Sequence, residues 1–191
     1  MPNFDPQKHQ RRSIRLKGHD YTQAGAYFVT VVTWQRECLF GEIVDGEMVL
    51  TDFGAAATEE WFKAAEIREN VILHPEEMML MPNHVHGIIR IVEGQGRIPG
   101  AVGAQRRCAP TQDVNVSPGS LGAMVRAYKS AVTRRINALR HTPGLPVWQR
   151  NYYEHIIRDH PEFDAIRRYI LDNPFQWGLD GENPDALRLE K

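Results

Sequence analysis

Strand-like and helix-like segments follow one another along this 191-residue chain in an order that few folds accommodate. Runs of β-branched and aromatic residues such as AYFVTVVTW predict buried strands, and apolar residues at intervals of three and four predict helices. The last helix is bounded by Pro161 in its first turn and by Pro174 beyond its end. In chain order, we expect a strand over 26–34, a hairpin over 41–51, a helix over 53–69, strands over 71–81 and 84–92, a loop over 93–120, a helix over 121–140, a strand near 154–157 and a helix over 160–173.

This order predicts an α+β protein with one antiparallel sheet and helices packed mainly on one face. The chain is 42% hydrophobic and long enough to bury one core, but too short for two domains of ordinary size. We expect a single domain over 1–177, with a basic arm over 1–20 and a polar tail over 178–191 that frays. The loop over 93–120 is rich in Gly and Pro and shows no period, so we expect it to be functional or disordered.

The sequence also excludes several classes of protein. No run approaches the roughly 18 consecutive apolar residues that a membrane span needs, and no signal peptide is visible. The cysteines, Cys38 and Cys108, lack the spacing of a metal-binding pair. We therefore expect reduced thiols in a cytoplasmic protein that does not contact a membrane.

The net charge of −1 conceals a segregation of charge along the chain. Residues 1–17 carry five Lys and Arg against one Asp, and residues 121–158 carry seven against one Glu. Residues 38–77 carry ten Asp and Glu against two basic residues. A basic face attracts polyanions, nucleic acid above all, although a solvated helix surface would produce the same pattern.

The strongest local signal is Asn83-His84-Val85-His86 at the start of an apolar strand. Because side chains alternate along a strand, His84 and His86 point to the same face. Two neighbouring imidazoles offer two ligand atoms to a divalent cation. The motif alone leaves open the alternative that both histidines are merely hydrogen-bonded.

A second signal lies on the last helix, where Tyr169 and Asn173 are four residues apart and share one face. The amide oxygen of Asn suits Mg²⁺ or Mn²⁺, and the phenol of Tyr can act as a covalent nucleophile. In this arrangement His84, His86 and Asn173 would hold a metal ion, and Tyr169 would be the nucleophile. A phosphate between the ion and the Tyr169 oxygen would meet the needs of phosphoryl transfer. A tyrosine that only packs on the sheet is the alternative.

Several motifs in order carry a resemblance to a known family. MPNHVHGII, SLGAMVRAYKSAVTRRIN, VWQRNYYEHIIRD and YILDNPFQWGL follow one another after an N-terminal RRSIRLKGHDYTQAGAYFVT. This pattern resembles the single-tyrosine HUH transposase superfamily, and most closely its branch of REP-associated tyrosine transposases. The resemblance covers nearly the whole chain outside 93–120 and the polar tail. It implies a ferredoxin-like or RRM-like sheet with the His pair on a central strand and the tyrosine on a C-terminal helix.

The resemblance also implies a function. It is metal-dependent cleavage of single-stranded DNA, in which the tyrosine becomes joined to the 5′ phosphate and a free 3′ hydroxyl can rejoin the strands. By motif position, His84 and His86 are the HUH pair, Tyr169 is the nucleophile and Asn173 stands in the place of the third ligand, with Mg²⁺ or Mn²⁺ as the ion. The family acts on hairpin DNA with single-stranded flanks, as monomers or homodimers. The long loop over 93–120 departs from the family pattern.

We expect further residues to contact the DNA. Basic side chains would neutralise phosphates, and aromatic rings would stack on unpaired bases, although packing in the core is the alternative for the rings. The candidates are Arg11, Arg12, Arg15, Arg126, Lys129, Arg134, Arg135, Trp148 and Arg150, with Tyr152 and Tyr153 as further stacking residues.

Two other functions compete with a transposase. A phosphoesterase with paired His-x-Thr/Ser motifs would also use histidines, but this chain has a single His-x-His followed by Gly87. A module that binds nucleic acid without catalysis would retain the basic segments and would bind without a metal.

Overall fold

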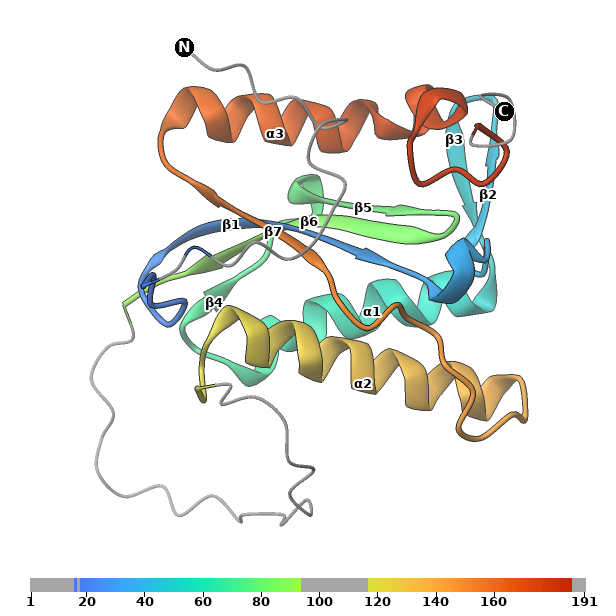
Figure 1. Ribbon diagram of the computed structural model, residues 1–191, viewed down its shortest axis with the longest axis horizontal. Coiled ribbons are helices and arrows are strands. Elements are labelled where there is room, and N and C mark those ends of the chain that lie inside the picture. Colours follow the sequence, from blue (N-terminus) through green and yellow to red (C-terminus); the bar gives the residue numbers. More distant parts are fainter. Residues whose placement is uncertain (1–15, 17, 94–116, 187–191) are drawn as a thin grey trace.

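The structure is a computed structural model that describes residue 16 and residues 18–93 and 117–186. Its centre is one antiparallel sheet (Figure 1). The chain order of its strands is β1 (Gly25–Val32), β4 (Val71–Ile72), β5 (Met78–Met81), β6 (His84–Ile91) and β7 (Tyr153–Ile157). In space the order is β4-β6-β1-β7, and β5 pairs with β6 on the same side as β4. The strand β6 is therefore flanked on both sides.

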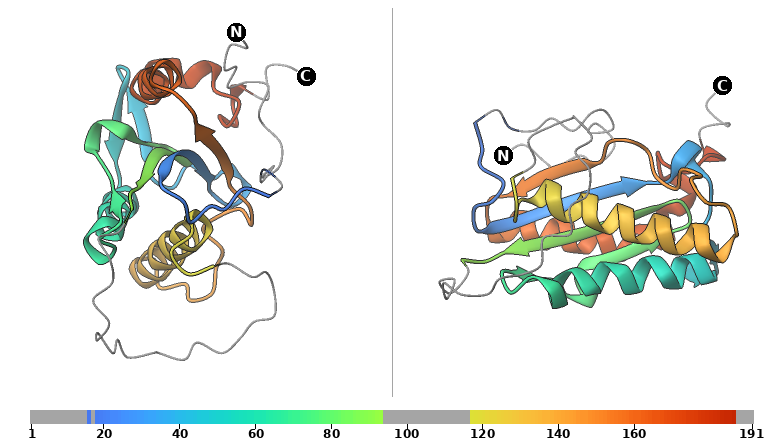
Figure 2. Two further views of the ribbon diagram at one scale, coloured as in Figure 1. Left: turned by 90° about the vertical axis from the view of Figure 1, so that its left-hand side faces the viewer. Right: turned by 90° about the horizontal axis from the view of Figure 1, so that it is seen from below.

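Helices cover both faces of the sheet. One face carries α1 (Asp52–Ile67) and α2 (Leu121–Leu139), which lie side by side, and the opposite face carries α3 (His160–Asp172) (Figures 1 and 2). With α1 after β1 and α2 between β6 and β7, the arrangement confirms the predicted ferredoxin-like α+β class with helices mainly on one face. The helix on the other face, α3, is the one that carries Tyr169.

Short elements connect these layers. A hairpin of β2 (Gly41–Val44) and β3 (Glu47–Leu50) turns at Asp45 and Gly46, where φ is 52° and 82°. Two consecutive positive φ values are the geometry of a type I′ turn, which Asp-Gly favours. The 3₁₀ helices are η1 (Trp34–Arg36), η2 (Pro75–Glu77) and η3 (Asn173–Leu179).

The helices begin where the sequence predicts them. The side chains of Thr51, Ser120 and Asp159 accept hydrogen bonds from backbone N–H groups in the first turns of α1, α2 and α3. Such caps satisfy donors that have no partner inside the helix. No helix of the described residues is long and apolar enough to cross a membrane.

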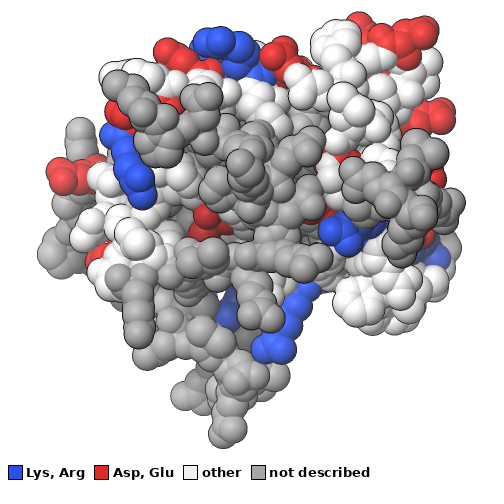
Figure 3. Space-filling model, turned by 45° about the horizontal axis from the view of Figure 1, so that its top comes forward, with Lys and Arg blue, Asp and Glu red and all other residues white. Residues whose placement is uncertain are grey.

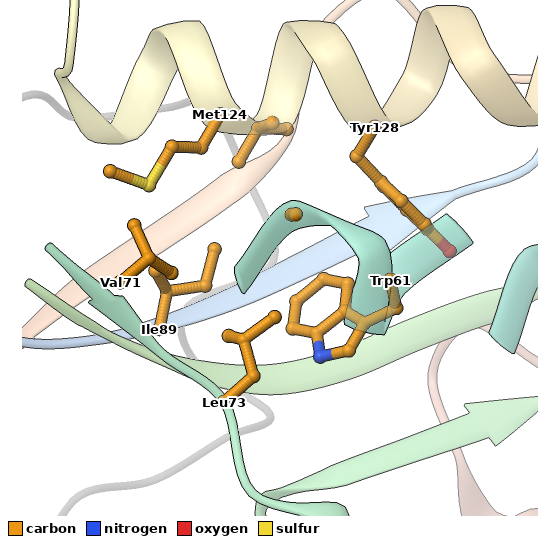
Figure 4. A pocket seen from close by; sticks show the side chains of 8 residues that line it. Trp61, Val71, Leu73, Ile89, Met124 and Tyr128 are labelled. Carbon is orange, nitrogen blue, oxygen red and sulfur yellow. The ribbon is translucent and has the colours of Figure 1, made fainter. Parts of the chain in front are cut away.

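Each face of the sheet has its own apolar core. The larger core lies under α1 and α2, and the smaller one unites Phe28 and Ile88 of the sheet with Ile166 and Ile170 of α3. In the larger core, the Trp61 ring lies against the strand at Gly87, where an added Cβ would come within 2.3 Å of the indole. Figure 4 shows this ring beside a small apolar pocket between α1, α2 and the sheet.

Parts of the sequence predictions lie outside the described residues. These are most of the arm over 1–20, including Arg11, Arg12 and Arg15, and most of the loop over 93–120. The first part of the expected tail differs from the prediction. Residues 180–183 fold back toward the turn between β5 and β6, where the Asn83 side chain donates to the Glu182 carbonyl oxygen and Arg36 of η1 pairs with the Glu182 carboxylate.

Candidate metal and tyrosine site

The His pair lies at the centre of the sheet and faces α3. On β6, His84 is opposite Val32 of β1 and Met81 of β5, while His86 is opposite Thr30 and Met79. The alternation of side chains puts both imidazoles on the same face as Ile88, which belongs to the core under α3. Pairing on both sides makes this strand a rigid support for the two rings.

The two imidazoles meet a carboxylate. The Nε2 atoms of His84 and His86 are 2.9 Å apart, and Asp180 Oδ2 is 3.7 Å from His84 Nε2. One ligand atom from each of the three residues lies within 4.8 Å of the others. Asp180 follows η3, so the carboxylate comes from a segment far along the chain from β6, the strand that carries both histidines.

The other nitrogen of each ring has its own partner. His84 Nδ1 is 2.8 Å from Asn83 Oδ1, and His86 Nδ1 is 2.8 Å from Thr30 Oγ1. Hydrogen bonds of this kind orient the imidazoles of metal sites and leave Nε2 as the ligand atom. Both Nε2 atoms here point into the cluster.

Burial keeps both imidazoles neutral. Desolvation lowers the pKa of His84 from 6.5 to about 3. Desolvation also lowers the pKa of His86 well below its usual value, and the neighbouring His84 adds to this effect while Asp180 opposes it. A neutral imidazole offers the lone pair that a metal ion requires.

Tyr169 lies beside the pair. Its hydroxyl oxygen is 3.3 Å from His86 Nε2, and its ring meets those of His86 and Phe28 at centroid distances of 5.2 and 6.1 Å. Burial and then the Asp180 charge raise the pKa of the Tyr169 phenol, and a hydrogen bond with the Asn173 side chain partly opposes them. The phenol is therefore neutral, and a positive charge nearby would favour its ionised form.

The donor set fits a divalent cation. It consists of two neutral imidazole nitrogens and the Asp180 carboxylate, whose buried Oδ2 has no hydrogen-bond partner among the described residues. A buried carboxylate oxygen without a partner is costly, and a cation would relieve that cost. Imidazole and carboxylate ligands are common to Mn²⁺ and other divalent ions of this series.

Asp180 was absent from the predicted ligands. It lies in a polar stretch without periodicity, and only the turn through η3 brings it back to β6. Asn173, the predicted oxygen ligand, is buried at the end of α3 next to the Tyr169 phenol. The predicted nucleophile and the predicted His pair do come together in the structure.

Comparisons with known proteins agree with this fold. No protein-family model matches the chain. An "Uncharacterized protein" of Haemophilus influenzae (strain Rd) is 39% identical over 175 residues, which is 90% of this chain and 92% of that protein, so the two belong to one family. A solved structure of a REP-associated tyrosine transposase bound to a REP hairpin aligns with a TM-score of 0.56 at 20% identity, over 87% of this chain and 76% of that one. This chain has the fold of a tyrosine transposase.

In this transposase fold, two of the residues predicted to contact DNA have partners within the protein. Trp148 is 7% exposed and packs against Phe40 and Tyr128, so the structure does not place its ring where an unpaired base could stack on it. The Lys129 ammonium donates to the carbonyl oxygens of residues 149–151 at 2.6, 3.1 and 3.4 Å. Desolvation lowers the pKa of Lys129 to about 8.

The remaining basic candidates fall into two groups, those that contact other side chains and those that are exposed to solvent. Arg135 pairs with Glu59 and Glu60 of α1, and Arg134 donates to Ser130 on its own helix. Arg126 and Arg150 are exposed. On the face of the transposase fold seen in Figure 3, the described Lys and Arg side chains form several separate groups rather than one patch.

Proposed function

We propose that this protein is a metal-dependent endonuclease and strand transferase for single-stranded DNA that acts through a covalent 5′-phosphotyrosine. One observation carries the proposal: the hydroxyl of Tyr169 lies 3.3 Å from a ligand nitrogen of the His84–His86 pair. A nucleophile next to a cation site is what cleavage of a phosphodiester requires. The fold shared with a tyrosine transposase supports the same function.

A divalent metal ion would be held by His84 Nε2, His86 Nε2 and Asp180 Oδ2, and we assign the Asn173 amide oxygen as a further ligand. When bound, an Mg²⁺ or Mn²⁺ ion supplies positive charge to a non-bridging phosphate oxygen. The protein provides the ligands in a buried position at the centre of the sheet, where electrostatic interactions are stronger than in water. The matching role of Tyr169 is to present its oxygen to the phosphorus from α3.

The chemical step exchanges one phosphate ester for another. The Tyr169 oxygen forms a bond to phosphorus as the bond from phosphorus to the 3′ oxygen breaks. The phenol proton is released to solvent, and the leaving 3′ oxygen takes up a proton and becomes a hydroxyl. In the reverse direction, a 3′ hydroxyl attacks the phosphotyrosine and the bond to Tyr169 breaks. Strands are therefore rejoined without an external source of energy.

The substrate we propose is hairpin-forming DNA with single-stranded flanks. The transposase of the same fold is described as bound to a REP hairpin. Exposed Arg126 and Arg150 of this chain, and Arg11, Arg12 and Arg15 outside the described residues, are the side chains we assign to phosphates. These contacts explain binding without reading the base sequence.

Trapping the covalent intermediate tests the proposal. Wild-type protein with Mn²⁺ and hairpin-bearing oligonucleotides, labelled on the 3′ side of the cleavage point, should form a labelled adduct that survives denaturation. Tyr169→Phe should form none. Tyr153→Phe is the matched control, because Tyr153 is a second phenol on the same face, in ring contact with Phe28, and the adduct should persist. An adduct in Tyr169→Phe, or none with wild type across a panel of hairpins, would contradict the proposal.

The same assay separates the competing functions. A binding module would retain DNA without metal and would be indifferent to His84→Ala. A phosphoesterase of another type would hydrolyse DNA in Tyr169→Phe. The proposed enzyme loses cleavage in both variants and keeps most of its DNA affinity, since the phosphate contacts lie elsewhere.

A further inference from the structure

Asn83 is a fully buried residue that connects three parts of the site. It lies between β5 and β6, directly before His84, and none of its surface is exposed. Its Oδ1 is 2.8 Å from His84 Nδ1. Its Nδ2 donates to the carbonyl oxygens of Arg36 at 3.1 Å and Glu182 at 2.7 Å. The amide therefore links His84 to η1 and to the segment that carries Asp180.

The two carbonyl oxygens determine how the amide is oriented. A carbonyl oxygen only accepts hydrogen bonds, so the NH₂ end of Asn83 must face Arg36 and Glu182. The Oδ1 end then faces His84, and an oxygen there can only accept. The proton of the His84 ring must therefore be on Nδ1, which leaves the lone pair on Nε2 directed into the cluster.

His86 lacks this constraint. Its Nδ1 partner is the hydroxyl of Thr30, which can donate or accept. Either nitrogen of His86 can hold the proton, and the Nε2 proton would bridge the 2.9 Å to His84 when no cation is bound. Of the two rings, His84 is the one whose tautomer the surrounding fold determines.

The Glu182 contact also positions the carboxylate. Glu182 is held by Asn83 through its carbonyl oxygen and by Arg36 through its carboxylate, at 2.8 Å from Arg36 Nε. Its backbone N–H donates to Asp180 Oδ1 at 2.7 Å. This bond occupies one oxygen of Asp180 and leaves Oδ2 facing His84.

We propose that Asn83 is the positioning residue of the site: it sets the tautomer of His84 and holds the segment that presents Asp180. The inference rests on the proposed function only where metal binding is concerned. The tautomer and the anchoring of the segment are properties of the protein without metal or DNA.

The first test uses the wild-type protein without metal. Nitrogen-15 NMR of labelled histidines should show His84 protonated on Nδ1 and bare on Nε2, with the assignment made by the loss of that signal in His84→Gln. A proton on Nε2 of His84 would overturn the proposal. No variant of Asn83 is needed for this measurement.

The second test removes the amide. Asn83→Leu keeps a similar volume without hydrogen bonds, and Asn137→Leu is the matched control. Asn137 is also buried and also donates to a carbonyl oxygen, that of Leu145, but it lies at the end of α2. In Asn83→Leu, amide hydrogen exchange should accelerate across residues 180–185, whereas Asn137→Leu should leave it unchanged. Unchanged exchange in Asn83→Leu would overturn the anchoring role.

The third test measures the affinity of the protein for Mn²⁺. Titration with Mn²⁺, followed by electron paramagnetic resonance, should show affinity about 10- to 100-fold weaker in Asn83→Leu and unchanged in Asn137→Leu. Equal affinity in wild type and Asn83→Leu would overturn the role in metal binding. If wild type binds no Mn²⁺ while the NMR and exchange results hold, the proposed function fails and the positioning role of Asn83 stands.

Discussion

The hydroxyl oxygen of Tyr169 on α3 lies 3.3 Å from Nε2 of His86 on β6, although 83 positions separate the two residues in the chain. The contact exists because α3 packs on the face of the sheet opposite α1 and α2. Ile166 and Ile170 anchor the helix on Phe28 and Ile88, and Tyr169 is carried on the same side of the helix. Apolar packing thus places the proposed nucleophile, Tyr169, beside the candidate metal ligands.

Removing the Asp180 charge should weaken metal binding. Asp180→Asn keeps the size of the side chain but replaces a carboxylate with a weaker neutral ligand, so Mn²⁺ affinity should fall at least about tenfold. Asp172→Asn is the control, because Asp172 is an exposed carboxylate at the end of α3. Isothermal titration with Mn²⁺ measures both. Equal losses in the two variants would mean that only the net charge matters.

Acidification should destabilise the metal-free protein. The pKa of His84 is about 3 in the folded state and near 6.5 when unfolded, so the unfolded chain binds more protons between these values. The stabilisation that comes from keeping His84 neutral is therefore complete above pH 6.5 and is lost as the pH drops toward 3. Over this range the free energy of unfolding falls by at most about 1.4 kcal/mol per pH unit for each buried histidine.

Urea unfolding at intervals from pH 7 to pH 4 measures this slope. His84→Gln should flatten it, and His160→Gln should not, because His160 is exposed at the start of α3. The interpretation would be wrong if both variants retained the wild-type slope.

A methyl group at residue 87 should disturb the strand that carries the histidines. A Cβ at Gly87 would lie 2.3 Å from the Trp61 ring, so Gly87→Ala must displace the indole or bend β6. Overpacking of this kind costs about 1–3 kcal/mol of unfolding free energy. Gly25→Ala on β1 is the control, since its nearest contact would be an ordinary 3.5 Å. Denaturant unfolding should show no comparable loss in that variant.

Arg126 and Lys129 should respond differently to substitution, although they lie three residues apart on α2. Arg126 is exposed, so Arg126→Gln should weaken DNA binding and reduce the dependence of log Kd on log salt concentration by about one unit. Lys129→Met should instead lower the unfolding free energy, because three backbone carbonyl oxygens lose their donor. A lower salt dependence in Lys129→Met, without a loss of stability, would assign it to the DNA surface.

Local patterns in the sequence are sufficient for the elements and for pairs of residues within one element. The turn at Asp45-Gly46 and the caps at Thr51, Ser120 and Asp159 depend only on neighbours within a few positions. The common face of His84 and His86 follows from the period of a strand in the same way. These features need no knowledge of the rest of the chain.

The assembled site depends on contacts between distant segments, which periodicity does not encode. Asp180 reaches the His pair because η3 turns the chain back over the sheet, and Asn83 orients His84 because carbonyl groups of Arg36 and Glu182 happen to converge on it. Trp148 was predicted to stack on bases, with core packing as the alternative, and it is buried because Thr33 after β1, Phe40 and Tyr128 of α2 surround it. Burial and the pairing of remote polar groups are set by how the layers pack, so they emerge only when the whole chain has folded.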